Sequence, residues 1–463
     1  MRLDLTIING TLVDEHGSRV VDLGVSGGRV AQVAMAGSLP SDPTTEVIDA
    51  KGLWVLPGFV DPHVHCRAPD HPEREDFASG TAAAAAAGIT TILEMPIADV
   101  GVSRPAILEA RRALAERDAY VDFGLYGACG SLDPETIHGL ARAGACAFKI
   151  FTLNVPPARR ASFEGITITR EDDLYRALSI VAETGLVCAV HAENDALLQI
   201  GRERAQRLQL TGADAFLSAH PQAAEVMAVA WMAVLAEATG ARVHLVHMTS
   251  AWALDFVRLA KRRGVALSAE TCPHYLLFDE ETARTYGRWA KIAPPMRSAA
   301  DRDALWAALD DGTLDILASD HAPFLPHEKE LEDILAIPSG LPNLEAFTPL
   351  MLSAAHDGRL AMSKMVGLMS ARPARLYGLY PRKGTLQPGS DADLVLYDPH
   401  LSSVIDTTTW HSRSRGSAKI FHGLPYRGRI TRTIVRGRTV YQDGQLLGSR
   451  GWGQMVRPEP VRP

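Results

Sequence analysis

The chain alternates short apolar runs with longer stretches in which apolar residues recur every three or four positions. Short apolar runs bounded by Gly, Pro or Asp favour buried strands, and longer periodic stretches favour helices. Eight runs predict strands at residues 55–60, 91–95, 121–126, 147–151, 187–191, 242–247, 265–270 and 316–319. Helices are predicted at residues 77–87, 104–117, 172–184, 223–238, 251–263 and 301–308. This alternation predicts an α/β fold of the (β/α)8 barrel type.

A doubly wound open sheet is the rival architecture for the same alternation. It would be favoured by a Gly-x-Gly-x-x-Gly segment after a strand, or by another loop that cradles phosphate. The sequence has neither after its predicted strands. The pattern therefore favours the closed TIM barrel, in which reacting groups lie at the C-terminal ends of the strands.

The two ends of the chain carry a different pattern, with short β segments separated by Gly and Asp turns. We expect residues 1–53 and 384–445 to pair into one small β-sandwich-like domain beside a barrel of residues 54–383. Two unrelated β caps are the alternative. Residues 446–463 contain three prolines and are predicted to form a loosely attached C-terminal tail.

Composition narrows the class of protein. The 463 residues are 46% hydrophobic and 22% charged, with a net charge of -7, which is typical of a globular protein and argues against nucleic acid as a partner. The sequence has no run of 18 apolar residues and no apolar N-terminal segment of the signal-peptide kind. Five scattered cysteines favour reduced thiols. We expect a cytoplasmic protein that does not enter a membrane.

Polar side chains stand at or near the C-terminal ends of five predicted strands. His63 and His65 follow the first strand, and their spacing of two places both rings on the same side. The others are Lys149, His191, His247 and Asp320. Each alone has an ordinary reading as a solvated or capping residue, but a barrel would bring all six around one axis. Imidazole and oxygen donors suit a zinc-like ion.

Lys149 differs from the others because an ammonium group has no lone pair for a metal. Its side chain could remain charged if it extends from the apolar strand and places its ammonium group in solvent. Burial would instead lower its pKa and favour the free amine. A free amine can take up carbon dioxide, and the resulting carbamate offers two oxygens that can bridge two metals.

Seven motifs in one order resemble the amidohydrolase superfamily, specifically its cyclic amidase branch of allantoinases, dihydroorotases and dihydropyrimidinases or hydantoinases. They are PGFVDPHVH (57–65), FK (148–149), VHAEN (190–194), VHMTS (246–250), ETCPHYL (270–276), APPMR (293–297) and SDHAP (319–323). The resemblance spans residues 1 to 440. It implies a barrel with a β-sandwich-like side domain and two divalent metal ions, usually zinc. It also implies a homo-oligomer, either a dimer or a tetramer.

The resemblance also implies roles for the six residues. His63, His65 and Asp320 would hold one metal, His191 and His247 the other, and Lys149, carboxylated on its side-chain nitrogen, would bridge them. A metal-bridging hydroxide would attack a ring amide. Asp320 would be the catalytic residue that moves the proton to the leaving nitrogen.

Departures from the family pattern bear on the substrate. Arg67 matches the arginine of dihydroorotases and allantoinases, and suits a carboxylate or a ureido carbonyl. The usual Asn after Met95-Pro96 is absent, and Phe324 stands where dihydroorotases carry a carboxylate-binding His. The Tyr that hydantoinases place shortly after the carboxylated lysine is absent from residues 152–155, and the segment KIAPPMR (291–297) is most similar to allantoinases. We therefore rank an allantoinase-like activity first, a hydantoinase-like or dihydropyrimidinase-like activity second and dihydroorotase third.

Three more residues are predicted near the substrate. Gly340 and Asn343 align with a family loop over the substrate, although Asn343 could equally cap a helix. His321 is predicted to contact the substrate or to orient a metal ligand.

Two other classes of protein remain as alternatives. One is a metal-free assembly protein of the dihydropyrimidinase-related type, which the six retained ligand positions disfavour. The other is a mononuclear deaminase, which Lys149 disfavours.

Overall fold

A computed structural model describes the chain except for residues 1, 40–42, 99, 156–160 and 460–463. Its centre is an eight-stranded parallel sheet whose strands follow the chain order, from β6 to β13. The strands are β6 (Phe59–Val64), β7 (Ile89–Glu94), β8 (Asp122–Ala128), β9 (Ala147–Phe151), β10 (Val187–His191), β11 (Arg242–Leu245), β12 (Leu267–Thr271) and β13 (Ile316–Leu317). A parallel bridge between Val64 and His321 links the first strand to the segment after the last. The predicted barrel is confirmed.

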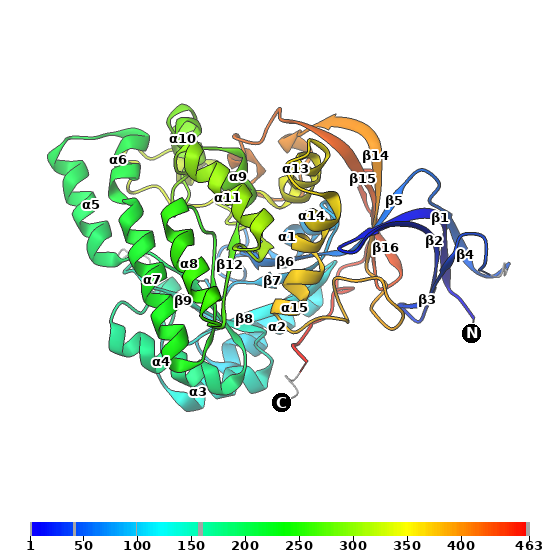
Figure 1. Cartoon of the computed structure of the whole chain (residues 1–463), viewed down its shortest axis with the longest axis horizontal. Helices are drawn as coiled ribbons and strands as arrows, with labels where there is room; N and C mark the ends of the chain where they lie inside the picture. Colours follow the sequence, from blue (N-terminus) through cyan, green and yellow to red (C-terminus); the bar gives the residue numbers. More distant parts are fainter. Residues whose placement is uncertain (1, 40–42, 99, 156–160, 460–463) are drawn as a thin grey trace.

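Helices surround these strands (Figure 1). The helices are α1 (Phe77–Ala86), α2 (Pro105–Asp118), α3 (Pro134–Ala143), α4 (Glu171–Thr184), α5 (Asp195–Arg207), α6 (Gly212–Ala219), α7 (Gln222–Thr239), α8 (Ala251–Arg262), α9 (Pro273–Leu277), α10 (Glu280–Tyr286), α11 (Ala299–Asp311), α12 (Pro326–Lys329), α13 (Leu344–His356), α14 (Met362–Met369) and α15 (Ala371–Leu376). Helices on the outside and side chains inside bury both faces of the strands, which explains why they read as continuous apolar runs.

The strand predicted at residues 55–60 is in fact two strands in two different sheets. Trp54–Pro57 forms β5, which pairs with β14 (Leu394–Val404) in the terminal sheet, while Phe59 begins the barrel. Gly58 separates them, and a Cβ there would lie 2.2 Å from Oγ1 of Thr90. Only glycine permits this close passage. The first barrel strand therefore extends to Val64 and carries His63 itself.

Strands from the two ends of the chain pair with one another, as predicted, and form one nine-stranded sheet, seen at the right of Figure 1. Its order is β17-β16-β15-β14-β5-β1-β2-β3, with β4 paired to β1. The remaining bounds are β1 (Leu5–Asp14), β2 (Gly17–Ser26), β3 (Arg29–Met35), β4 (Glu46–Asp49), β15 (Pro425–Val435), β16 (Arg438–Gln442) and β17 (Gln445–Leu446). Buried Leu, Ile and Val residues from both ends make its core.

The C-terminal tail is not loosely attached over its described part, contrary to the prediction. The amide of Phe123 donates to the carbonyl of Gln454 at 3.0 Å, and the amide of Val456 donates to the carbonyl of Phe123 at 2.7 Å. Val456 is fully buried. The tail thus adds a short bridge to β8 through Met455, because its apolar residues ahead of the prolines pack against the barrel. Pro460 and Pro463 lie outside the described residues.

Within the described ranges, no helix combines the length and the apolar character needed to cross a membrane.

Candidate metal centre

The structure brings all six predicted ligand residues to the C-terminal end of the barrel. They lie within or just after five strands, as the sequence predicts, and each is at least 95% buried: His63, His65, Lys149, His191, His247 and Asp320. Because they come from strands around the barrel, only the closed fold places them together.

Three of the side chains form one group. Nε2 of His63 lies 3.2 Å from Oδ1 of Asp320, and Nε2 of His65 lies 3.8 Å from the same oxygen. Their potential ligand atoms all lie within 4.8 Å of one another. Two imidazoles and a carboxylate at this spacing can share one divalent ion.

The other two histidines form a second group beside the first. Nδ1 of His191 lies 2.9 Å from Nε2 of His247, so two ring nitrogens face one point. The ring of His247 also lies next to that of His63, with 5.6 Å between their centroids. The five side chains therefore form two adjoining sets of donors.

Lys149 supplies a buried amine near both sets. Its Nζ is fully enclosed and has no hydrogen-bond partner among the described residues. Burial lowers the pKa of Lys149 to about 8, while the charges of Glu270 and Asp320 act against this decrease. With this pKa roughly a tenth of the amine is unprotonated at pH 7, and an oxygen-bearing group on Nζ fits this unsatisfied position.

Two buried carboxylates orient the histidines. Oε1 of Glu270 lies 2.7 Å from Nδ1 of His63, and Oε2 of Glu193 lies 2.8 Å from Nε2 of His191. Each carboxylate accepts from one ring nitrogen and so leaves the other nitrogen with a lone pair for a metal. Sequence reasoning missed both glutamates. Glu193 follows His191 by two residues, and Glu270 ends a predicted strand; both positions carried a usable signal.

Charge states also suit metal binding. Burial, followed by the charge of Lys149, lowers the pKa of His63 to about 4. Burial also lowers the pKa values of His65 and His247 well below the ordinary range. The pKa of Glu270 lies below its usual value because, although burial opposes this, His63 and His244 pair with it. The imidazoles are neutral at pH 7, the form that binds metal.

Asp320 is held in an uncommon backbone conformation. Its φ is +50°, and that of His247 is +43°, in the left-handed region that non-glycine residues seldom adopt. The neighbouring Ser319 is fixed from two sides: its amide donates to Oδ1 of Asp61 at 3.1 Å, and its carbonyl accepts from Nδ2 of Asn343 at 2.6 Å. These bonds fix the segment that aims the Asp320 carboxylate.

A cavity of about 710 Å³ opens above these groups. The four histidines of the two donor sets and Asp320 lie in its wall, as do Arg67 and Gly340. This volume lies in the range of sites that enclose small molecules. Arg67 and Gly340 therefore line the cavity, and their contact with a substrate stays a prediction.

Asn343 and His321, which were also predicted to bind substrate, do not line this cavity. Both are fully buried. Nδ1 of His321 accepts from the amide of Asn343 at 3.1 Å, and its Nε2 lies 3.2 Å from Oε2 of Glu75. Both ring nitrogens are thus occupied by protein groups, which corrects the predicted substrate contact of His321. Asn343 precedes α13 without a side-chain cap and instead supports Ser319.

Phe324 has a role that the sequence did not reveal. The guanidinium of Arg67 lies over its ring, 4.8 Å from the centroid, and that of Arg74 lies 5.1 Å from it. Nε of Arg74 also donates to Glu328 at 2.8 Å. The ring cannot replace a carboxylate-binding histidine, but it orients Arg67 by a cation–π contact.

Comparison with known proteins agrees with this geometry. The sequence model of the Amidohydrolase family matches residues 54–440. An allantoinase of Rubrobacter xylanophilus is 35% identical over 98% of both chains, and a D-phenylhydantoinase of Escherichia coli is 33% identical over 99% of this chain and 98% of its own. The solved L-hydantoinase (dihydropyrimidinase) from Arthrobacter aurescens has a TM-score of 0.93, with 31% identity over 98% of this chain and 100% of its own. The chain belongs to the amidohydrolase family.

Proposed function

We propose that the protein is a metal-dependent hydrolase that opens a cyclic amide ring, with a cyclic ureide of the allantoin type as its first-choice substrate. One observation carries the proposal: two adjoining sets of neutral imidazoles and Asp320 line a cavity large enough for a small ring, and a buried lysine lies behind them. The family membership and the names of the similar proteins support the same reaction class.

The donor set fits two divalent ions, and zinc suits it best among common metals. His63, His65 and Asp320 would hold one ion, and His191 and His247 the other. Lys149, carboxylated on Nζ by carbon dioxide, would bridge them; its unpartnered buried amine supports this assignment. When bound, the two ions supply a water acidic enough to lose a proton near neutral pH and an electrophile for the carbonyl oxygen.

The chain's own residues provide the proton path and the binding contacts. The carboxylate of Asp320 takes the proton of the attacking water and passes it to the ring nitrogen that leaves. Glu270 and Glu193 keep His63 and His191 in the tautomers that present a lone pair. Arg67, supported by Phe324, donates to a ureido carbonyl at the far side of the ring.

A hydantoin or dihydropyrimidine ring is the second candidate, because the solved L-hydantoinase (dihydropyrimidinase) superposes on 98% of the chain. Dihydroorotate ranks third, because Phe324 offers no donor to its carboxylate. The test is a hydrolysis panel on zinc-loaded protein with allantoin, hydantoins, dihydrouracil, dihydroorotate and cyclic imides. We expect allantoin to be opened fastest. Turnover of dihydroorotate alone would overturn the ranking, and turnover of none would overturn the reaction class.

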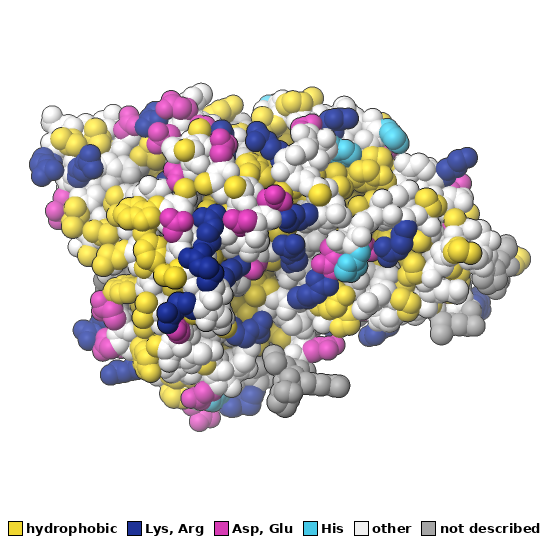
Figure 2. Space-filling model, viewed as in Figure 1, with side chains coloured by type: hydrophobic (Ala, Val, Ile, Leu, Met, Phe, Trp, Pro, Cys, Tyr) yellow, Lys and Arg dark blue, Asp and Glu magenta, His cyan; other side chains and the backbone are white. Residues whose placement is uncertain are grey.

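A homo-oligomer, dimer or tetramer, is also proposed. Figure 2 shows hydrophobic side chains gathered on the face where α7 and α8 lie. Four large ones on these helices are about half exposed or more: Met227, Val234, Trp252 and Leu259. A second copy of the chain is the proposed cover for this face.

All five cysteines are unpaired, which supports the cytoplasm as the proposed location.

A further inference from the structure

One wall of the cavity is a segment without helix or strand. Residues 331–340 run between α12 and α13, and most of them line the cavity, ending with Pro338, Ser339 and Gly340. A segment that lacks a backbone ladder must have its carbonyl groups satisfied by other donors if it is to hold one shape.

Lys291 supplies those donors. Only 4% of the residue is exposed, and its Nζ donates to the carbonyls of Ile334 at 2.6 Å, Leu335 at 3.3 Å and Ile337. In addition, the carbonyl of Lys291 accepts from the amide of Gly340 at 3.0 Å. A single residue therefore holds both the middle and the end of the wall.

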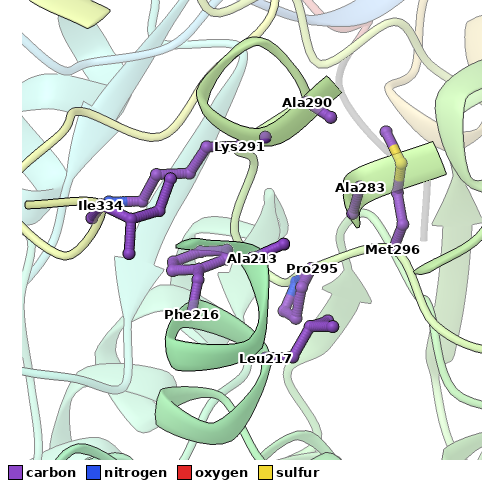
Figure 3. A pocket seen from close by; sticks show the side chains of 10 residues that line it. Ala213, Phe216, Leu217, Ala283, Ala290, Lys291, Pro295, Met296 and Ile334 are labelled. Atoms are coloured by element: carbon purple, nitrogen blue, oxygen red, sulfur yellow. The ribbon is translucent and has the colours of Figure 1, made fainter. Parts of the chain in front are cut away.

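The surroundings of Lys291 make these bonds hard to replace. Nζ lies 4.8 Å from the centre of the Phe216 ring on α6, beside Ile334 and above a small apolar pocket (Figure 3). Ile334 and Ile337 belong to a buried apolar cluster with Phe216. Lys291 and Ile337 also line the cavity, but only 4% and 2% of these residues are exposed, so carbonyls that lost Nζ would be poorly reached by water and costly to leave unsatisfied.

The end of the wall is fixed against the catalytic side of the cavity. Gly340 has a φ of +155°, and a Cβ at this position would lie 2.4 Å from the carbonyl oxygen of Ala322 and 2.9 Å from the ring of Phe324. The wall thus contacts the segment that follows Asp320 and the ring that supports Arg67. A shift of the wall would change the space available to a bound ring.

We propose that Lys291 is a positioning residue that sets the shape of the 331–340 wall and thereby the affinity for the substrate ring. Lys291 also lines the cavity, but its Nζ is used by the carbonyls of the wall, so we assign it a positioning role and not a catalytic one. The effect on substrate rests on the proposed function, whereas the effect on the wall does not. No metal-ligand candidate is among the residues that Lys291 holds.

The test compares Lys291→Met, which keeps the length of the stem and removes Nζ, with the wild-type protein. We expect KM for the best cyclic amide to rise about tenfold with kcat changed less than about threefold, because a wall contributes equally to binding of substrate and transition state. Hydrogen exchange at the amides of residues 331–340 should become at least about tenfold faster. Metal content should not change.

Two further variants separate positioning from general stability. Lys261→Met also removes a lysine with three hydrogen bonds, to Gly312 and Asp315, but outside the cavity; it should leave KM and wall exchange unchanged. Lys291→Gln keeps a hydrogen-bond donor on a shorter side chain, so it should change KM and wall exchange less than Lys291→Met does. It replaces Lys291→Met in the test if that variant does not fold.

The outcomes distinguish the two proposals. Unchanged wall exchange in the folded Lys291 variants would overturn the role of Lys291, whatever the substrate is. Faster exchange with an unchanged KM would overturn its effect on affinity. If the wild-type protein opens no cyclic amide, the proposed function fails, and wall exchange alone still decides whether Lys291 holds the wall.

Discussion

Glu270→Gln tests whether buried carboxylates prepare the histidines for metal. Glu270 is fully buried and bonds to Nδ1 of His63 at 2.7 Å and to Nε2 of His244 at 3.0 Å. Glutamine keeps the shape and one acceptor oxygen but removes the charge. His244 can adapt, because its other nitrogen lies 2.8 Å from the hydroxyl of Ser268, which can donate or accept. The main loss therefore falls on His63.

The size of this loss follows from the type of bond. A hydrogen bond to a charged group contributes about 1.5–3 kcal/mol, and a neutral one about 0.5–1.5 kcal/mol. A difference of about 1–1.5 kcal/mol corresponds to a zinc Kd raised about tenfold, at the lower end of the 10–100-fold range of such substitutions. The assay is competition for zinc against a chromophoric chelator at pH 7.

Asp122→Asn is the matched control. Asp122 is equally buried and accepts from Lys383, Arg436 and the amide of Gln454, but it begins β8, at the opposite end of the barrel from the metal centre. It should lower stability without changing the zinc Kd. A Glu270→Gln protein whose zinc Kd stays within twofold of wild type would refute the reasoning. So would an Asp122→Asn protein whose zinc Kd rises as much as that of Glu270→Gln.

Three further predictions concern single side chains. Lys149→Ala should bind fewer than two metals and lose activity, measured by metal analysis and hydrolysis; an active, fully metallated variant would refute the bridge. Phe324→Leu should raise KM about threefold with little change in kcat, because it removes a cation–π contact of about 0.5–1 kcal/mol under Arg67; an unchanged KM would contradict this. Burial, aided by the charge of Lys291, lowers the pKa of Lys329 from 10.5 to about 7. The unfolded chain therefore binds more protons between these values, and stability rises with pH by up to ~1.4 kcal/mol per pH unit. Lys329→Met should be more stable than wild type to urea at pH 7, with the advantage shrinking toward pH 10; an advantage equal at both pH values would contradict the shift.

The barrel and the grouping of the six candidate ligands could be predicted because their signals are local. Apolar runs mark strands that are buried on both faces, and the spacing of His63 and His65 fixes their common side. The exact start of the first strand could not be predicted, because the apolar run continues through Gly58 while its hydrogen bonds change from one sheet to the other. A continuous pattern does not report a change of partner.

The substrate contacts could not be predicted to the same degree because they depend on contacts between distant segments. His321 stands in a family motif and Asn343 aligns with a family loop, yet each is directed into the protein by partners far along the chain, Glu75 and Ser319. In the sequence, Phe324 indicates only the loss of a carboxylate-binding histidine, and the structure is needed to show that its ring lies beneath Arg67. Lys291 gave no sequence signal for its position against the wall, because its partners are backbone carbonyls.

Titration of zinc into chelator-treated protein, followed by hydrolysis of the best cyclic amide, tests the central claim most directly. The two adjoining donor sets predict that activity is absent without metal and rises until two equivalents per chain are bound. Full activity without metal, or saturation at one equivalent, would contradict the account.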